Sequence, residues 1–366
     1  MSATASPQAF LLRRTFIQLG RGMNRFRSLT DRRYMPLWLY HAPVLAWLAW
    51  RRLKGQRLRY FCMTNPGYEL GGAFGVSKVA VMRQLSALGA PIPKTLCVDH
   101  ADKHAVSAAK MIAAVGPHGI VKPEFGGRSY GVGVFRSEAE AEALRRASAD
   151  SQQGYVVQEF IPGDEYSVFC ARDREGGGLR TIDAVHRRPL YVVGDGASTL
   201  AALVRRQDCG DAETIVAGLG PRGSEIPAYG ERARVGQLGS HAHGCDFISI
   251  DIDDHPALAA MVDALDRFRG VDYFRADVMV KDDRPYILEI NGAFSEPLGA
   301  YDPGNDMAAF YRRFFDVYRI GQSIGEDRYK AGARLPSRRH VLRRMTAGVA
   351  LVKDAKAARS TRPAPA

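Results

Sequence analysis

The spacing of apolar residues along the chain predicts short helices alternating with short strands. Behind Ser77, a typical N-cap residue, apolar side chains recur at helical spacing as far as Leu88, and Gly89 then ends the pattern. The same spacing predicts helices over 101–115 and 138–149. Apolar runs bounded by Gly, Pro or polar turns predict strands over 95–98, 119–122, 155–160 and 165–171.

The C-terminal half continues this alternation. Helical spacing returns over 255–269, and a last helix is expected near 306–318. Between them, apolar strands over 273–280 and 285–291 flank the polar turn 281–284, which predicts a β-hairpin. Helices mixed with largely antiparallel strands, without an internal repeat, predict the α+β class.

This hairpin carries the most informative chemistry. Centring its turn near Asp283 pairs Asp277 with Glu289 and Arg275 with Asn291, and the two-residue period of a strand puts all four on one face. Two carboxylates and a carboxamide offer oxygens to Mg²⁺, and the arginine offers a fork to a phosphoryl oxygen. A solvated ion-pair ladder on an exposed strand is the alternative. The opposite face is expected in the core: Val278, Val280, Leu288 and Ile290.

A second group of candidate residues precedes the hairpin. The segment 125–134 holds four glycines and predicts a flexible hairpin whose backbone amides can approach a ligand closely. The predicted strand before it ends in Lys122, and the helix behind Ser77 presents Lys78.

These motifs together, in this order, resemble the ATP-grasp superfamily. They are Lys78, 121–123, the 126–133 loop, 158–165, and Asp277 with 289–291, over roughly residues 70–320. The resemblance implies an ATP-grasp fold of two α+β lobes that grip ATP. We therefore expect a basic amino-terminal segment with an apolar aromatic helix (1–60), an ATP-grasp domain (61–320) and a basic carboxy-terminal tail (321–366).

The resemblance also implies a role for each matched residue. Lys78 and Lys122 would contact the phosphates, and Glu165 the ribose hydroxyls. Arg275 would hold the transferred phosphoryl group, whose oxygens Lys122 helps to neutralise. The phosphate loop would include Gly126, Gly127 and Ser129. The linker that reads the adenine edge would comprise Gln158, Glu159, Phe160 and Ile161. The metal ligands would be Asp277, Glu289 and Asn291.

The activity that the resemblance implies is that of a carbon–nitrogen ligase. ATP and two Mg²⁺ ions, which Mn²⁺ can replace, would activate a small-molecule carboxylate as an acyl phosphate, and an amine would then attack it. Segments 192–200, 226–231 and 241–246 are similar to cyanophycin synthetase and related amino-acid ligases. Residues 292–295 depart from the Ser/Thr-x-Pro-Gly of D-alanyl-D-alanine ligase, which leaves the acceptor open. An ATP-dependent phosphotransferase, or a non-catalytic nucleotide-binding protein at an anionic membrane surface, stays an alternative.

Composition and charge narrow the choice of partners. With 366 residues, 46% of them hydrophobic, the chain is long enough for two or three lobes, which excludes a mainly disordered protein. The net charge of +12 resides at the ends: residues 1–60 hold twelve basic and one acidic side chain, and 328–366 eleven and one. The rest is acidic, so the body lacks the basic face expected of a specific nucleic-acid-binding domain.

The two basic ends raise the question of membrane contact. The apolar run 35–50 is shorter than the roughly 20 residues that a bilayer span needs. As a helix it would pack on the body or lie on a membrane surface. A basic amphipathic helix over 338–356 and a solvated, partly disordered end are both open. We expect a cytoplasmic protein, with peripheral contact on the inner face of the membrane as an alternative and the oligomeric state open.

Rival motifs are weak. No GxxxxGK[ST] loop occurs, and the GxGxxG at 218–223 contains a proline. His241, His243 and Cys245 offer three ligands where a structural zinc site takes four, so a metal there is an open alternative. The segment 186–188 could hold an acyl phosphate or acidic substrate, or form a surface patch. The cysteines are scattered and predict no disulfide framework: Cys62, Cys97, Cys170, Cys209 and Cys245.

Overall fold

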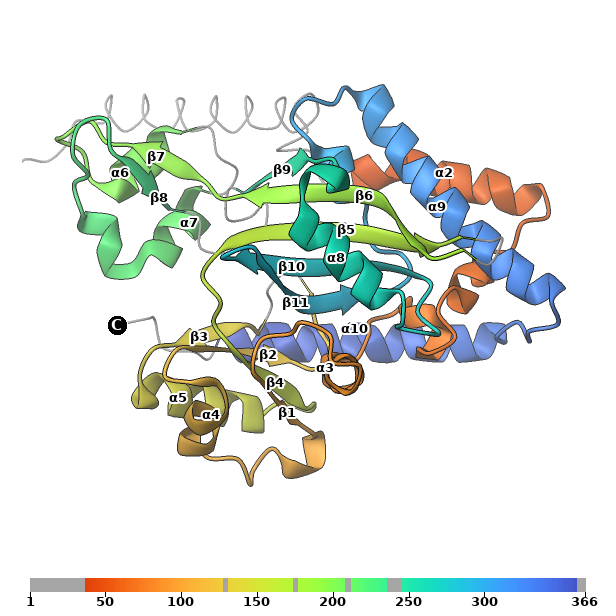
Figure 1. The fold of residues 1–366 in the computed structure, drawn as a ribbon, viewed down its shortest axis with the longest axis horizontal. Coiled ribbons are helices and arrows are strands. Elements are labelled where there is room, and N and C mark those ends of the chain that lie inside the picture. The colour runs from red at the N-terminus through yellow and green to blue at the C-terminus, as the bar shows by residue number, and fades with distance from the viewer. Residues whose placement is uncertain (1–36, 128–130, 174–176, 208–211, 236–244, 361–366) are drawn as a thin grey trace, which may run out of the picture. The chain divides into compact units, whose positions relative to one another are not determined.

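The computed structural model describes residues 37–127, 131–173, 177–207, 212–235 and 245–360 (Figure 1). The chain divides into two compact units, 1–56 and 57–366. In the first unit the structure describes helix α2 (Leu37–Leu53), whose last turn contains Arg51 and Arg52. Within the described ranges, no helix is both long and apolar enough to cross a bilayer.

The second unit contains a four-stranded sheet of order β1-β4-β2-β3. Its strands are β1 (Thr95–Val98), β2 (Gly119–Pro123), β3 (Gly133–Phe135) and β4 (Tyr155–Glu159). Two helices pack on it, α4 (Ala108–Val115) and α5 (Glu138–Ala149), and the shared core includes Met111, Val121, Phe135, Leu144 and Tyr155. The helix predicted over 138–149 is confirmed residue for residue.

The helix predicted over 101–115 is wrong in its first half. His100–Asp102 form a 3-10 turn, η3, and the α-helix begins only at Ala108. Ser107 explains the later start, because its hydroxyl accepts a hydrogen bond from the Lys110 amide and so caps the helix there.

A larger, five-stranded sheet follows, with the order β11-β10-β5-β6-β9 (Figure 1). Its strands are β5 (Asp164–Arg172), β6 (Leu179–Arg188), β9 (Asp246–Ser249), β10 (Tyr273–Lys281) and β11 (Arg284–Asn291). Helix α8 (Pro256–Leu265) covers one face of this sheet (Figure 1). Every strand pairing within the described residues is antiparallel, which confirms the α+β class.

Helix α3 (Lys78–Ala87) joins the two sheets. It begins at the predicted cap, where the Ser77 hydroxyl accepts a hydrogen bond from the Ala80 amide. Its apolar residues Val79, Met82 and Leu85 share one buried cluster with α8, with the large sheet and with Val156 of the small sheet. The first helical residue, Lys78, is thereby fixed between the sheets.

Within the second unit, the middle of the chain forms a small subdomain. Strands β7 (Tyr191–Val193) and β8 (Arg232–Arg234) pair, and helices α6 (Leu200–Arg206) and α7 (Ala212–Leu219) pack on them. The remaining described elements are the 3-10 helices η1 (Leu58–Met63), η2 (Glu69–Gly72), η4 (Gly220–Ser224), η6 (Ile252–Asp254) and η7 (Leu298–Tyr301), with helices α9 (Met307–Lys330) and α10 (Arg338–Ser360).

Helix α9 is longer than the predicted helix near 306–318, and the expected domain boundary at residue 320 falls inside it. Glycine commonly signals a helix end, yet Gly321 and Gly325 lie within α9. A Cβ on Gly321 would come within 2.8 Å of the Tyr273 ring, and one on Gly325 would meet the backbone of Tyr60. The two glycines therefore let α9 approach η1 and β10 closely.

Candidate nucleotide and metal site

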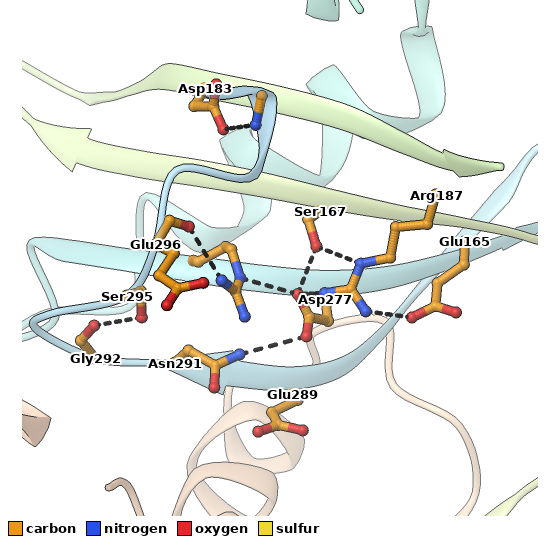
Figure 2. Close-up of polar contacts among 12 residues, drawn as sticks. Glu165, Ser167, Asp183, Arg187, Asp277, Glu289, Asn291, Gly292, Ser295 and Glu296 are labelled. Atoms are coloured by element: carbon orange, nitrogen blue, oxygen red, sulfur yellow. Dashed lines mark hydrogen bonds and ion pairs between the residues drawn. The ribbon is translucent and has the colours of Figure 1, made fainter. Parts of the chain in front are cut away.

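Strand register gathers polar side chains on the face of the large sheet that is turned away from α8 (Figure 2). Asp277 pairs with Glu289 of β11, and Arg275 pairs with Asn291, so both predicted cross-strand pairs are confirmed. On its other side Asp277 pairs with Ser167 of β5.

A β-bulge interrupts this hairpin. Register shifts between Asp277 and Val278, so that Val278 pairs with Ile287 and Leu288 is left in the bulge. Ile287 is fully buried in the core, whereas Leu288 is only half-buried. The prediction that Leu288 lies in the core is therefore wrong. Val278 and Ile290 are buried as predicted, and Val280 packs at the margin of the same cluster.

Asp277 is the centre of a buried network of hydrogen bonds and ion pairs. Its Oδ1 lies 2.6 Å from the Ser167 hydroxyl, 2.7 Å from Nη2 of Arg187 and 3.3 Å from Nε of Arg275. Its Oδ2 accepts a longer bond, 3.4 Å, from the amide of Asn291. Burial opposes ionisation, but Arg187, Arg275 and the Ser167 hydroxyl outweigh it and lower the pKa of Asp277 to about 2.

Arg187 joins Asp277 to the predicted ribose-binding carboxylate. Its Nη1 lies 2.6 Å from Oε1 of Glu165, and its Nε donates to the Ser167 hydroxyl at 2.8 Å (Figure 2). Burial disfavours the charged guanidinium, but Asp277 and Glu165 raise the pKa of Arg187 overall.

The two neighbours of Arg187 point elsewhere. Arg188 is half-exposed and pairs with Asp246. His186 stacks on Tyr166, with ring centroids 4.9 Å apart. The alternation of side chains along β6 thus divides the segment 186–188, and only Arg187 lies in the site. The sequence showed the basic run but not which of its residues faces Asp277, because the pairing partner of β6 could not be read from it.

Two lysines reach the edge of the hairpin, Lys78 from helix α3 and Lys122 from strand β2 of the small sheet. Nζ of Lys78 lies 3.2 Å from Oε1 of Glu289 and donates to the Gly126 carbonyl at 2.8 Å. Nζ of Lys122 donates to Oε1 of Gln158 at 2.7 Å and contacts the Leu288 carbonyl at 3.4 Å. Burial lowers the pKa of Lys122, and Glu289 opposes that shift.

Gln158, predicted as part of the linker, positions a lysine. It is buried, and its amide also contacts Sδ of Met82 and the Thr95 hydroxyl. A neutral amide oxygen at this place accepts a hydrogen bond from the Lys122 ammonium without neutralising its charge.

The rest of the predicted linker connects the two sheets. The Glu159 amide donates to the Lys94 carbonyl, the Phe160 amide donates to the His118 carbonyl, and Ile161 is buried. These contacts fix the linker backbone.

The remaining candidates are divided between described and undescribed residues. Gly127 is exposed, and nothing lies within 4 Å of the position of a Cβ. Ser129, His241, His243 and Cys209 lie outside the described residues. Cys245 is buried, which raises the pKa of its thiol to about 12. No group of three or more His, Cys, Asp or Glu suited to a metal ion occurs among the described residues, and the described cysteines are free.

The site nevertheless offers oxygen donors of the kind that Mg²⁺ prefers. Asp277 and Glu289 are neighbouring carboxylates, and Asn291 adds a carboxamide oxygen. Hard oxygen ligands fit Mg²⁺ or Mn²⁺ and disfavour softer metals. The donor set therefore fits the metal that the sequence implied.

The segment that follows β11 is held tightly against the site. Phe294 adopts a positive φ of 65°, a strained conformation for phenylalanine, while its ring lies 4.5 Å from that of Phe61. Arg275 donates to the Glu296 carbonyl at 3.1 Å. Buried Asp183 accepts from the Gly299 amide at 2.9 Å. Packing and hydrogen bonds thus fix the loop where the sequence departs from D-alanyl-D-alanine ligase.

Comparison with known proteins finds similarity to ATP-grasp proteins in part of the chain. Residues 76–179 match the family model of the ATP-grasp domain. Cyanophycin synthetase of Trichormus variabilis is 28% identical over 144 residues, covering 39% of this chain and 15% of the relative. The bifunctional protein GshAB of Listeria monocytogenes is 30% identical over 95 residues, 24% of this chain and 11% of the relative. The chain thus matches only a small part of the length of these relatives.

Solved structures give more distant matches. D-alanine–D-alanine ligase from Bacillus anthracis is 14% identical, with 69% of each chain covered and a TM-score of 0.43. D-cycloserine synthetase DcsG is 17% identical, with 68% of this chain and 71% of the other covered and a TM-score of 0.41. The family match includes Lys78, Lys122 and Glu165, on which the site is built. Residues 76–179 therefore resemble an ATP-grasp domain.

Proposed function

We propose that the protein is an ATP- and Mg²⁺-dependent ligase that joins a small-molecule carboxylate to an amine through an acyl phosphate. One observation carries the proposal: Lys78 of α3 lies 3.2 Å from Glu289 of β11. In this contact a lysine that lies between the two sheets meets the hairpin β10–β11, which carries the carboxylates. Juxtaposed cations and carboxylates are what a metal-bound triphosphate requires, since phosphate oxygens need the cations and the metal needs the carboxylates.

Three residues would hold the metal. Asp277, Glu289 and Asn291 supply oxygen ligands, and we propose two Mg²⁺ ions, with Mn²⁺ as a substitute. When bound, the metal would neutralise phosphate oxygens and help to orient the phosphoryl group.

The cationic side chains would share the phosphate charge. Lys78, Lys122 and Arg275 lie around the hairpin, and Gln158 holds the Lys122 ammonium in place. Arg187 is a further candidate, because phosphate oxygens can replace Asp277 and Glu165 as partners of its guanidinium. After that exchange Asp277 would be able to bind the metal, and Glu165 would be able to accept hydrogen bonds from the ribose hydroxyls.

The chemical steps then need no covalent nucleophile from the protein. A substrate carboxylate oxygen attacks the γ-phosphorus and ADP leaves. The amine nitrogen attacks the resulting acyl carbon, phosphate leaves as the carbon–nitrogen bond forms, and the nitrogen releases a proton to solvent or to the departing phosphate. Positioning of the reactants and neutralisation of the phosphate charge would account for the rate acceleration. Backbone around Gly126 and Gly127, already tied to Lys78, would exclude water that otherwise hydrolyses the acyl phosphate. We place this activity in the cytoplasm, where ATP is available.

The test is a phosphate-release screen. The full chain is incubated with ATP, Mg²⁺ and pairs of amino acids and dicarboxylates, and condensed products are sought by mass spectrometry. Glu289→Gln is expected to lower turnover by about 100-fold or more, because it removes a charge beside the transferred group. Asp283→Asn, in the exposed turn of the same hairpin, is the matched control and is expected to leave turnover unchanged.

Three results would contradict the ligase. A phosphorylated product without any amide would indicate a phosphotransferase. ADP formation that is equal in wild type and Glu289→Gln would remove Glu289 from the reaction. An equal loss of turnover in Glu289→Gln and Asp283→Asn would indicate that both substitutions disturb the hairpin as a whole.

A further inference from the structure

Helix α10 (Arg338–Ser360) packs on the second unit by one face. Oε2 of Glu69 lies 2.8 Å from Nε of Arg344, and Oε1 lies 3.4 Å from Nε2 of His340. One carboxylate thus holds two successive turns of the helix. The half-buried residues recur at helical spacing and define the inner face: His340, Val341, Arg344, Ala347, Gly348 and Leu351.

Two contacts further along fix the same orientation. A Cβ on Gly348 would come within 3.0 Å of the Phe74 carbonyl, so the helix backbone lies directly on that segment. The Leu351 carbonyl accepts a hydrogen bond from the Gln153 amide at 3.3 Å. Ion pairs, close backbone packing and this bond all lie on the inner face, so the opposite face points outward.

The outward face carries an apolar stripe. Leu342, Met345 and Val349 are 57%, 42% and 51% exposed. Their spacing of three and four residues places them on one side of the helix. Large apolar side chains that are exposed singly need no explanation, but three in register on one helix face indicate a partner.

The exposed part of the helix is also strongly basic. Arg338, Arg339, Arg343 and Lys353 are exposed, and the sequence from 331 to 353 contains no acidic residue. The rest of the body is acidic, since residues 61–327 hold 28 basic and 37 acidic side chains. Positive charge that accompanies an apolar stripe on an otherwise acidic body requires a partner that is both anionic and apolar.

We propose that the outer face of α10 docks the protein on an anionic phospholipid membrane, with the helix parallel to the surface. Leu342, Met345 and Val349 would enter the boundary between headgroups and acyl chains, while the arginines meet the phosphates. A nucleic-acid backbone would satisfy the arginines but offer nothing to the apolar stripe. The proposal goes beyond the ligase activity and does not depend on it.

The test uses the full chain and sedimentation with vesicles of phosphatidylcholine, either alone or with phosphatidylglycerol. Binding is expected only to the anionic vesicles and is expected to weaken as salt is raised. Replacing Arg338, Arg339 and Arg343 by Gln is expected to lower the partition coefficient about fivefold per arginine. The stripe variant, with Leu342, Met345 and Val349 replaced by Ser, is expected to lower it by at least about tenfold.

Matched controls separate docking from loss of the fold. Ile226→Ser with Tyr229→Ser removes exposed apolar side chains elsewhere and is expected to leave vesicle binding unchanged. Thermal melts followed by circular dichroism are expected to be equal for the wild type and both α10 variants, because the substituted side chains are exposed.

Several outcomes would overturn the proposal. Binding that the stripe variant retains would indicate plain electrostatic adsorption, and equal binding to neutral vesicles would remove the role of charge. Retention on heparin without vesicle binding would indicate a soluble polyanion or an acidic protein as the partner. Vesicle binding that is lost in Trp50→Ser of α2 but kept in the α10 variants would show that α2, and not α10, docks on the membrane.

Discussion

Arg187 reaches across strand β5 to Asp277, with Nη2 2.7 Å from Oδ1 (Figure 2). The same guanidinium lies 2.6 Å from Glu165. One buried cation therefore neutralises the carboxylate expected to hold the metal and the carboxylate expected to hold the ribose. Arg187 thus compensates the negative charge of both carboxylates.

The first prediction concerns this arginine. Arg187→Ala leaves the buried Asp277 and the partly buried Glu165 with reduced compensation, so the free energy of unfolding is expected to fall by about 3–5 kcal/mol. Arg188→Ala, one residue later, breaks a half-exposed pair with Asp246 and is expected to cost less than about 1 kcal/mol. Urea unfolding of both variants measures the difference. Equal losses in the free energy of unfolding would show that Arg187 stabilises the fold no more than Arg188 does.

The second prediction concerns the close approach of backbone at the end of β11. A Cβ on Gly292 would lie 2.8 Å from the Gly71 carbonyl oxygen and 2.8 Å from Cα of Gly72. Gly292→Ala is therefore expected to lower the free energy of unfolding by about 1–3 kcal/mol. Gly218→Ala, in α7 with nothing within 4 Å, is expected to stabilise by about 0.5–1 kcal/mol. Thermal unfolding of Gly292→Ala and Gly218→Ala measures both effects. An unchanged stability of Gly292→Ala would argue against this packing.

The third prediction concerns His186. Burial lowers its pKa, Asp164 opposes the shift, and Arg188 and His255 add to it. The neutral ring is thus favoured in the folded state, so its stabilising contribution is complete above the ordinary value of about 6.5 and is lost as the pH falls through the folded pKa. An NMR titration is expected to give a midpoint below about 6.5 for His186, and a lower one still in Asp164→Asn. A midpoint above 6.5 would contradict the burial described for this ring.

The sequence predicted the hairpin well because its signals are local. A polar turn between two apolar strands determines which residues face each other, and the pairs Asp277–Glu289 and Arg275–Asn291 follow from that alone. The same reasoning placed Leu288 in the core and was wrong, because a bulge adds one residue to β11. Nothing in the local composition signals that bulge.

Residues brought in by distant strands could not be predicted in this way. Ser167 and Arg187 contact Asp277 only because β5 lies between β10 and β6, and that order is a property of the whole sheet. The position of Lys78 was clear from its cap, but its contact with Glu289 depends on α3 packing between two sheets. Long-range register is therefore what the sequence left undetermined.

The central claim is that Lys78, Lys122 and the carboxylates of the hairpin together bind a metal-bound triphosphate. Calorimetric titration of ATP into the full chain, with and without Mg²⁺, tests it most directly. We expect saturable binding in the micromolar to millimolar range with Mg²⁺, loss of the heat in Lys122→Met and in Glu289→Gln, and unchanged circular dichroism. Absence of heat in the wild type, or the same heat in all three proteins, would contradict the claim.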